Sequence, residues 1–168
     1  LPIVRATAVH ALLWLPTEES AAALIPLLSD KSEFVRQETA YALGKTHTKS
    51  AVPALVERLF DDRKNGVRGA AAVALGQIAD DAAVVPLAQV LQPQAAMPGS
   101  KKARQSKSKE NVFVLRAAAR SLGQIGSRAG VPALIATLED EKVSDDVRRE
   151  AAIALGWIGD PMAVSALR

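Results

Sequence analysis

A short apolar pattern recurs along the chain and constrains its fold more than any other feature. Three copies align without gaps: VRGAAAVALGQIA from Val67, VLRAAARSLGQIG from Val114 and VRREAAIALGWIG from Val147. Two looser copies begin at Val4 and Val35. The first valines of successive copies are 31, 32, 47 and 33 residues apart. A period of about 32 residues indicates a repeat architecture, with one insertion of about 15 residues in the long interval.

A second apolar pattern keeps step with the first. It includes AVPALVERLFD from Ala51 and GVPALIATLED from Gly130, and its other copies begin at Ser20, Ala83 and Ala163. The spacings between its copies are again 31, 32, 47 and 33 residues. Because both patterns repeat with the same spacings, each repeat is predicted to hold one shorter and one longer element.

The apolar residues of the longer pattern have helical periodicity. In the last copy, Val147, Ala151, Leu155 and Ile158 follow one another at i, i+4, i+8 and i+11, which places them on one helix face. Helices shorter than about 12–15 residues are marginal in isolation, so each must bury this face against its neighbours. The prediction is an all-α, right-handed α-solenoid of about five repeats, with four complete helix pairs and a half repeat at each end.

Polar residues before the longer helices predict where those helices begin. Ser32, Asn65 and Ser144 are residue types that cap helix N-termini. Asp160 followed by Pro161 suits an N-cap and a first helical residue. We expect these positions to mark helix starts.

The composition excludes several classes of protein and of site. The chain has no cysteine, which excludes disulfides, thiolate metal sites and cysteine nucleophiles. No run approaches the roughly 18 apolar residues that a membrane span needs. The chain begins at Leu1 without a methionine and ends at Arg168 inside the repeating pattern. We therefore expect a single repeat domain over residues 1–168, as a fragment of a longer protein.

The positive charge is concentrated in one segment. The chain carries a formal charge of +3, of which residues 94–110 contribute +4, so the remainder sums to −1. We expect 94–110 to be a flexible insertion between the helices of the third pair. Its composition is typical of a solvated loop, and the alternative is weak, salt-dependent contact with nucleic acid or another anionic surface. The basic residues are Lys101, Lys102, Arg104, Lys107 and Lys109.

The two patterns together resemble a known family. The motif V-R-x-x-A-A-x-A-L-G-x-I-G followed by A-V-P-A-L is similar to the HEAT-like repeats of the phycobilin-lyase type, over the whole chain except 94–110. Members of that family include bilin lyases, a hydroxylase acting on a modified lysine, DNA-repair glycosylases and scaffolds without chemistry. The resemblance therefore implies the fold and leaves the function open.

The resemblance also implies two polar columns that bond within and between repeats. One holds an aspartate at the turn inside each pair, and the other holds an arginine after each first valine. The aspartate column reads Asp30, Asp61, Pro93 and Asp140. The arginine column reads Arg5, Arg36, Arg68, Leu115 and Arg148. The third pair departs from the pattern at both places, which predicts a break beside the insertion.

Residues suited to catalysis or metal binding are sparse. The resemblance implies that a hydroxylase on this scaffold uses repeated His–Glu pairs, but neither His10 nor His47 is followed by a glutamate. No nucleophile elbow, P-loop or dinucleotide fingerprint is present. We therefore predict no catalytic residue, no cofactor and no metal, and a protein that is not an enzyme. Close helix packing, rather than phosphate binding, is expected at Gly44, Gly76, Gly123 and Gly156.

The face of the longer helices opposite the core is the candidate binding surface. Counting each first valine as zero, positions 2 and 6 lie on that face and position 10 lies at its flank. The resemblance implies that this face lines the concave surface of the solenoid. These three columns contain no acid. The candidate partner-binding residues are Trp14, Tyr41, Lys45, Gln77, Arg116, Arg120, Gln124, Arg149 and Trp157.

Three functions remain open at this point. Arginine, tryptophan and tyrosine are enriched at binding hot spots, which favours a protein–protein interaction scaffold for an acidic or extended partner. A structural alternative is that Trp14 and Trp157 only cover the ends of the stack. The second function is an accessory or lyase-type enzyme subunit related to bilin lyases, and the third is anion binding through the basic insertion.

Overall fold

The computed structural model describes residues 1–14, 18–92 and 111–168, and it is helical with no strand in these ranges. The longer helices are α1 (Pro2–Leu12), α3 (Glu33–Lys45), α5 (Asn65–Ile78), α7 (Val112–Ile125) and α9 (Asp145–Ile158). The shorter helices are α2 (Glu18–Leu24), α4 (Val52–Asp61), α6 (Val84–Leu91) and α8 (Val131–Glu139). Short 3₁₀ turns join them: η1 (Ile25–Ser29), η2 (Lys49–Ala51), η3 (Asp81–Ala83), η6 (Arg128–Gly130) and η7 (Pro161–Ala163).

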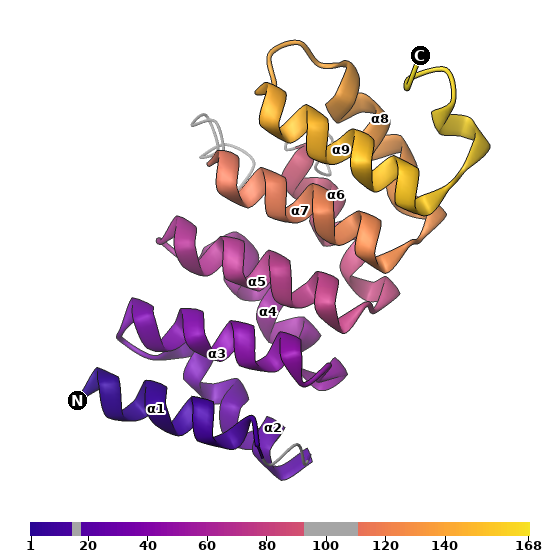
Figure 1. Cartoon of the computed structure of the whole chain (residues 1–168). Helices are drawn as coiled ribbons and strands as arrows, with labels where there is room; N and C mark the ends of the chain where they lie inside the picture. Colours follow the sequence, from indigo (N-terminus) through magenta and orange to yellow (C-terminus); the bar gives the residue numbers. More distant parts are fainter. Residues whose placement is uncertain (15–17, 93–110) are drawn as a thin grey trace, which may run out of the picture.

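The helices form two layers that follow the order of the chain. Figure 1 shows the longer helices side by side in one row, with the shorter helices in a second row behind them. Each longer helix packs on the next, from α1 to α9, and α4, α6 and α8 each pack on the longer helix that follows. The predicted all-α solenoid is confirmed. The predicted basic insertion at 94–110 lies outside the described residues.

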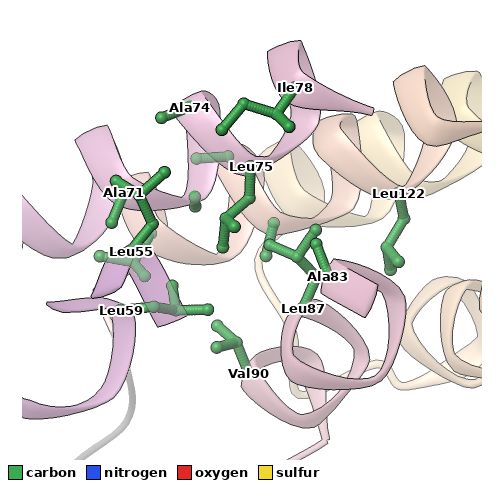
Figure 2. Packing of buried hydrophobic residues seen from close by; sticks show 14 of the residues in the cluster. Leu55, Leu59, Ala71, Ala74, Leu75, Ile78, Ala83, Leu87, Val90 and Leu122 are labelled. Atoms are coloured by element: carbon green, nitrogen blue, oxygen red, sulfur yellow. The ribbon is translucent and has the colours of Figure 1, made fainter. Parts of the chain in front are cut away.

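The core lies between the two layers and consists of the residues that the repeat pattern predicted. Val67, Ala71 and Leu75 of α5 are completely buried. Figure 2 shows Leu75 directed toward Leu59 of α4 and Leu87 of α6, so this leucine of α5 packs toward two of the shorter helices. Truncating a buried leucine such as Leu75 to alanine costs about 2–5 kcal/mol of stability.

The predicted helix starts are correct at most positions. Ser32 and Ser144 stand at the N-cap positions of α3 and α9, although neither side chain makes the capping hydrogen bond. Asn65 is the first residue of α5 rather than its cap. Asp160 accepts a hydrogen bond from the backbone N–H of Met162 at 2.9 Å, and the turn η7 begins there. Across the described ranges, no helix is both long and apolar enough to cross a membrane.

Candidate functional site

The glycine column forms the contacts between neighbouring longer helices. At Gly44 a Cβ atom would stand 2.8 Å from the Cα atom of Ala74, closer than real Cβ contacts allow. The same close approach recurs further along the row, where Gly76 faces Ser121 and Gln124, and Gly123 faces Ala154 and Trp157. The expected packing role of these glycines is therefore present at three successive interfaces.

The flank of the candidate surface, formed by the residues at position 10, takes part in this packing. Residues at position 10, such as Gln77, Gln124 and Trp157, lean on the glycine of the preceding helix. They are therefore partly engaged inside the stack rather than free on its face. Gln77 and Tyr41 are only half-exposed, whereas Lys45 and Gln124 are exposed.

The structure brings only some of the predicted binding residues together. Arg120 of α7 lies over the ring of Trp157 of α9, and Arg149 lies on the same helix as Trp157. Trp14 follows α1 at the far end of the row and is 85% exposed, so the two tryptophans do not share one site (Figure 1). The predicted partner-binding residues thus extend along the whole row of longer helices, and three of the arginines among them, Arg116, Arg120 and Arg149, lie on α7 and α9.

We refer to Arg116, Arg120, Glu150 and Trp157 as the α7–α9 cluster. The guanidinium of Arg120 lies 3.6 Å from the carboxylate of Glu150, and that of Arg116 lies 3.9 Å from it. The Cζ atom of Arg120 also stands 5.7 Å from the ring centroid of Trp157, within the range of a cation–π interaction. Glu150 is thus a buried acid approached by two arginines, one of which also lies over an aromatic ring.

Glu150 was missed by the sequence reasoning, and the face is not free of acids. The three columns considered contain none, but Glu150 stands at position 3, on the side of α9 that leans toward α7. Glu38 occupies the same position in α3, and its carboxylate lies 2.6 Å from Nε2 of His10 on α1. An acid that recurs at position 3 was the signal that could have identified both contacts.

A second set of charged contacts lies at the turns between helices, and we call it the turn edge. Arg5 donates two hydrogen bonds to the carboxylate of Asp30, at 2.6 and 2.8 Å. Arg36 does the same to Asp62, at 2.7 and 2.9 Å. The expected aspartate column is therefore real but misplaced by one residue in its second copy. Asp61 is the last residue of α4 and Asp62 follows as its C-cap, whereas Asp30 is the C-cap of the 3₁₀ turn η1.

The carboxylates of the turn edge also close the turns that follow them. Asp30 accepts a hydrogen bond from the backbone N–H of Ser32 at 2.7 Å, and Asp62 accepts one from Lys64 at 3.0 Å. The hydrogen bonds from Arg5 hold the pKa of Asp30 below its ordinary value. Burial opposes ionisation of Asp62, but the hydrogen bonds from Arg36 and Lys64 outweigh it and lower its pKa. The carboxylates of Asp30 and Asp62 have a structural role, because their oxygens already accept hydrogen bonds from an arginine and from the backbone.

Both histidines make contacts with a neighbouring longer helix. His10 is bound to Glu38, and Nδ1 of His47 lies 2.7 Å from the backbone oxygen of Gln77 on the next helix. Within the described residues, no three histidine, aspartate or glutamate side chains converge as metal ligands. The donor set therefore does not fit the repeated His–Glu arrangement that the family resemblance implied for a hydroxylase.

A hollow lined by described residues lies away from the α7–α9 cluster. It has a volume of about 630 Å³ and is bordered by α2, the end of α3 and η2. Its lining includes Ser20, His47 and Lys49, and it contains none of the predicted partner-binding residues. The sequence analysis did not point to this hollow.

Comparison with known proteins places the chain in a family. The profile of HEAT repeats matches residues 2–72, 23–96 and 102–168. The chain belongs to the HEAT repeat family. The matches leave only a few residues of the 168 uncovered, in agreement with the two stacked layers of Figure 1.

Curated relatives match parts of this HEAT-repeat chain. Deoxyhypusine hydroxylase of Gallus gallus is 49% identical over 47 residues, which cover 28% of this chain and 16% of the relative. The same enzyme of Drosophila pseudoobscura pseudoobscura is 41% identical over 78 residues, covering 46% and 26%. The bilin biosynthesis protein PecE of Mastigocladus laminosus is 42% identical over 64 residues, covering 38% and 24%. The matches thus span at most about a quarter of each relative.

Solved structures share the fold over nearly the whole chain. The complex of CpcE and CpcF of phycocyanin lyase from Nostoc sp. PCC7120 aligns with a TM-score of 0.69 at 24% identity, covering 96% of this chain and 66% of that one. Human deoxyhypusine hydroxylase aligns with a TM-score of 0.50 at 23% identity, covering 95% and 81%. The resemblance to HEAT-like repeats of the phycobilin-lyase type is confirmed.

These comparisons overturn the expectation that the chain is not an enzyme. Its relatives include a hydroxylase and a protein of bilin biosynthesis. That expectation rested on the absence of catalytic motifs from a sequence of 168 residues. A solenoid spreads its functional residues over many repeats, so a motif search of one stretch is a poor guide to activity.

Proposed function

We propose that this HEAT-repeat chain is the partner-binding part of an enzyme of the lyase-subunit type, and that the α7–α9 cluster contacts the protein partner. The relatives supply the enzyme class, because bilin biosynthesis and phycocyanin lyase appear among them. The cluster carries the proposal, because arginine and tryptophan side chains meet on it across two helices.

The arginines of the cluster retain the capacity to bind a partner. Their side chains are 43% (Arg116) and 56% (Arg120) exposed, and the distances of 3.9 and 3.6 Å to Glu150 exceed those of a good hydrogen bond. Each guanidinium has five N–H donors in a planar fork that matches a carboxylate. Acidic side chains of a partner can therefore bind Arg116 and Arg120 from the open face.

Glu150 and Trp157 prepare this surface for binding. The Glu150 carboxylate is only 7% exposed and lies below two like charges, so it reduces their mutual repulsion. The ring of Trp157 is half-exposed beside Arg120 and offers a rigid apolar contact, which is typical of interface anchors. An extended acidic segment with an apolar residue is the partner chemistry that such a surface favours.

Titration with a defined peptide tests the binding part of the proposal. A fluorescently labelled ten-residue polyglutamate peptide is the probe, and polyglutamine of the same length is its neutral control. We expect the acidic peptide alone to bind, and Arg120→Glu to weaken binding by at least about tenfold, as expected for loss of a charge-assisted contact. Arg128→Glu, on an exposed arginine of η6, is the matched control and retains affinity. Equal affinity of Arg120→Glu and the unmodified chain contradicts the proposal.

A transfer assay tests the enzyme part separately. Apo-phycocyanin and a linear tetrapyrrole are incubated with and without the chain, and covalently attached pigment is measured by absorbance after denaturation. We expect faster attachment in the presence of the chain and a slower rate with Arg120→Glu. Equal rates with and without the chain would remove the lyase assignment while leaving the peptide result intact.

A further inference from the structure

The hollow beside α2 replaces a contact that the other shorter helices make. The helices α4, α6 and α8 each pack on the 3₁₀ turn of the following repeat, which is η3, η6 and η7 in turn. Between α2 and η2, the hollow of about 630 Å³ takes the place of this packing. Its two walls are formed by described residues of successive repeats.

One wall of the hollow departs from the repeat pattern in α2. The second residue of the shorter pattern is a buried valine in three copies, Val52, Val84 and Val131. In α2 this residue is Ala21, which is half-buried and lines the hollow. Alanine lacks the two methyl groups with which valine fills this place, and close-packed interiors do not otherwise leave such space. The residue before it is Ser20, which is 7% exposed and stands where the other copies have alanine or glycine.

The other wall is the link from α3 to α4, and it lacks a carboxylate that two other links carry. At the equivalent position, Asp80 and Asp160 each accept a hydrogen bond at 2.9 Å from the backbone N–H two residues further on. Thr48 stands at this position here, and its side chain makes no capping hydrogen bond. Its hydroxyl lies 2.7 Å from that of Thr46 instead. A carboxylate supplied from outside would take the place that an aspartate occupies in those two links.

The residues that line the hollow suit a small molecule with an aliphatic body and a negative charge. Leu24 and Ile25 supply aliphatic surface, and none of the described lining residues is an acid. Lys49 supplies a cation: its Nζ atom lies 3.8 Å from the carboxylate of Asp80, but its side chain is 73% exposed and can turn toward a ligand. Sites for small molecules measure about 300–1,000 Å³ and combine apolar walls with a few polar groups.

We propose that this hollow binds a small aliphatic carboxylate. The carboxylate group would lie at the link, near Thr48 and Lys49, and the hydrocarbon chain would lie against Ala21, Leu24 and Ile25. This site is separate from the α7–α9 cluster, so it adds a small-molecule ligand to the protein partner of the proposed function.

Isothermal titration calorimetry with hexanoate tests the ligand class, and hexanamide is the neutral probe of the same shape. We expect hexanoate to bind saturably at one site per chain and hexanamide to bind more weakly. Lys49→Gln should lower the affinity for hexanoate by about threefold to fivefold, as expected for an exposed charge pair, and leave the affinity for hexanamide unchanged. Absence of saturable hexanoate binding, or equal affinity for the two probes, overturns the proposal.

A second variant tests the place of binding without weakening the fold. Ala21→Val restores the valine that three other copies bury, so it should fill part of the hollow, lower the affinity for hexanoate by at least about tenfold and leave stability in urea intact. Ala136→Val makes the same change on the exposed surface of α8 and should bind hexanoate like the unmodified chain. Equal affinity of Ala21→Val and the unmodified chain overturns the proposal.

The polyglutamate peptide keeps this result distinct from the proposed function. Because the hollow contains no residue of the α7–α9 cluster, Ala21→Val should bind the peptide with unchanged affinity. A parallel loss of peptide and hexanoate binding in Ala21→Val would reflect general damage to the stack and overturn the assignment of the hollow as a separate site.

Discussion

The arginines of the turn edge and those of the α7–α9 cluster both lie on the longer helices of the stack, yet their surroundings differ. The Arg36 side chain is 13% exposed and donates two short hydrogen bonds to Asp62, which is 2% exposed. Arg120 is mostly exposed and only approaches Glu150. The comparison teaches that an arginine saturated by a buried carboxylate maintains the fold, whereas a partly exposed arginine is available to a partner.

The two regions also divide the molecule along its length. The turn edge links α1 through α5, and the cluster belongs to α7 and α9. In the second half Leu115 stands where an arginine would face Asp140, and Arg148 donates instead to the backbone oxygen of Leu138 at 2.9 Å. The predicted break in the polar columns at the third pair is thus seen at Leu115, while Pro93 lies outside the described residues.

The largest effect is expected at the turn edge. Asp62→Ala leaves Arg36 buried without its carboxylate, which costs about 3 kcal/mol of unfolding free energy. Glu150→Ala serves as the matched variant, and because Arg116 and Arg120 remain solvated, its cost is about 1 kcal/mol or less. Urea denaturation followed by circular dichroism measures both. Equal losses of unfolding free energy for the two variants would contradict the distinction between the turn edge and the α7–α9 cluster.

A second effect, a change of about 1–3 kcal/mol in unfolding free energy, is expected where two longer helices pack closely. Gly123→Ala places a Cβ 2.8 Å from the Cα of Ala154, and such overpacking is destabilising by that amount. Gly156→Ala adds the same atom where nothing among the described residues is near, so it is expected to stabilise α9 by up to about 1 kcal/mol. Thermal melts at low protein concentration compare the two. Changes of the same sign would contradict the close packing at Gly123.

The smallest effect concerns acid stability. The pKa values of Asp30 and Asp62 are lowered in the folded chain. Their contribution is therefore complete above the unfolded pKa of about 3.9 and is lost as the pH falls through the lower folded pKa. Stability measured between pH 6 and pH 2 should fall less for a double Asp30→Asn, Asp62→Asn variant than for the unmodified chain. An equal fall would assign acid sensitivity to other groups.

Much of the fold was predictable because a solenoid is built from contacts between neighbours. The period of about 32 residues and the helical spacing of residues such as Val67, Ala71 and Leu75 are local properties, and each repeat contacts only the next. The site was less predictable. The repeat spacing predicts Asp61 as the partner of Arg36, but α4 includes Asp61 and the turn begins at Asp62. Spacing alone does not show where a helix ends.

The sequence by itself determined that this chain stacks helix pairs, which residues form its core and where glycines let the helices approach. These features depend on the rotation of residues about one helix axis, which the order of residues encodes directly. Only the tertiary structure decided that Glu150 reaches Arg116 and Arg120, and that Arg36 binds Asp62 rather than Asp61. Such side-chain contacts depend on how adjacent helices are offset and tilted. The offset results from packing between repeats rather than from the sequence of any single repeat.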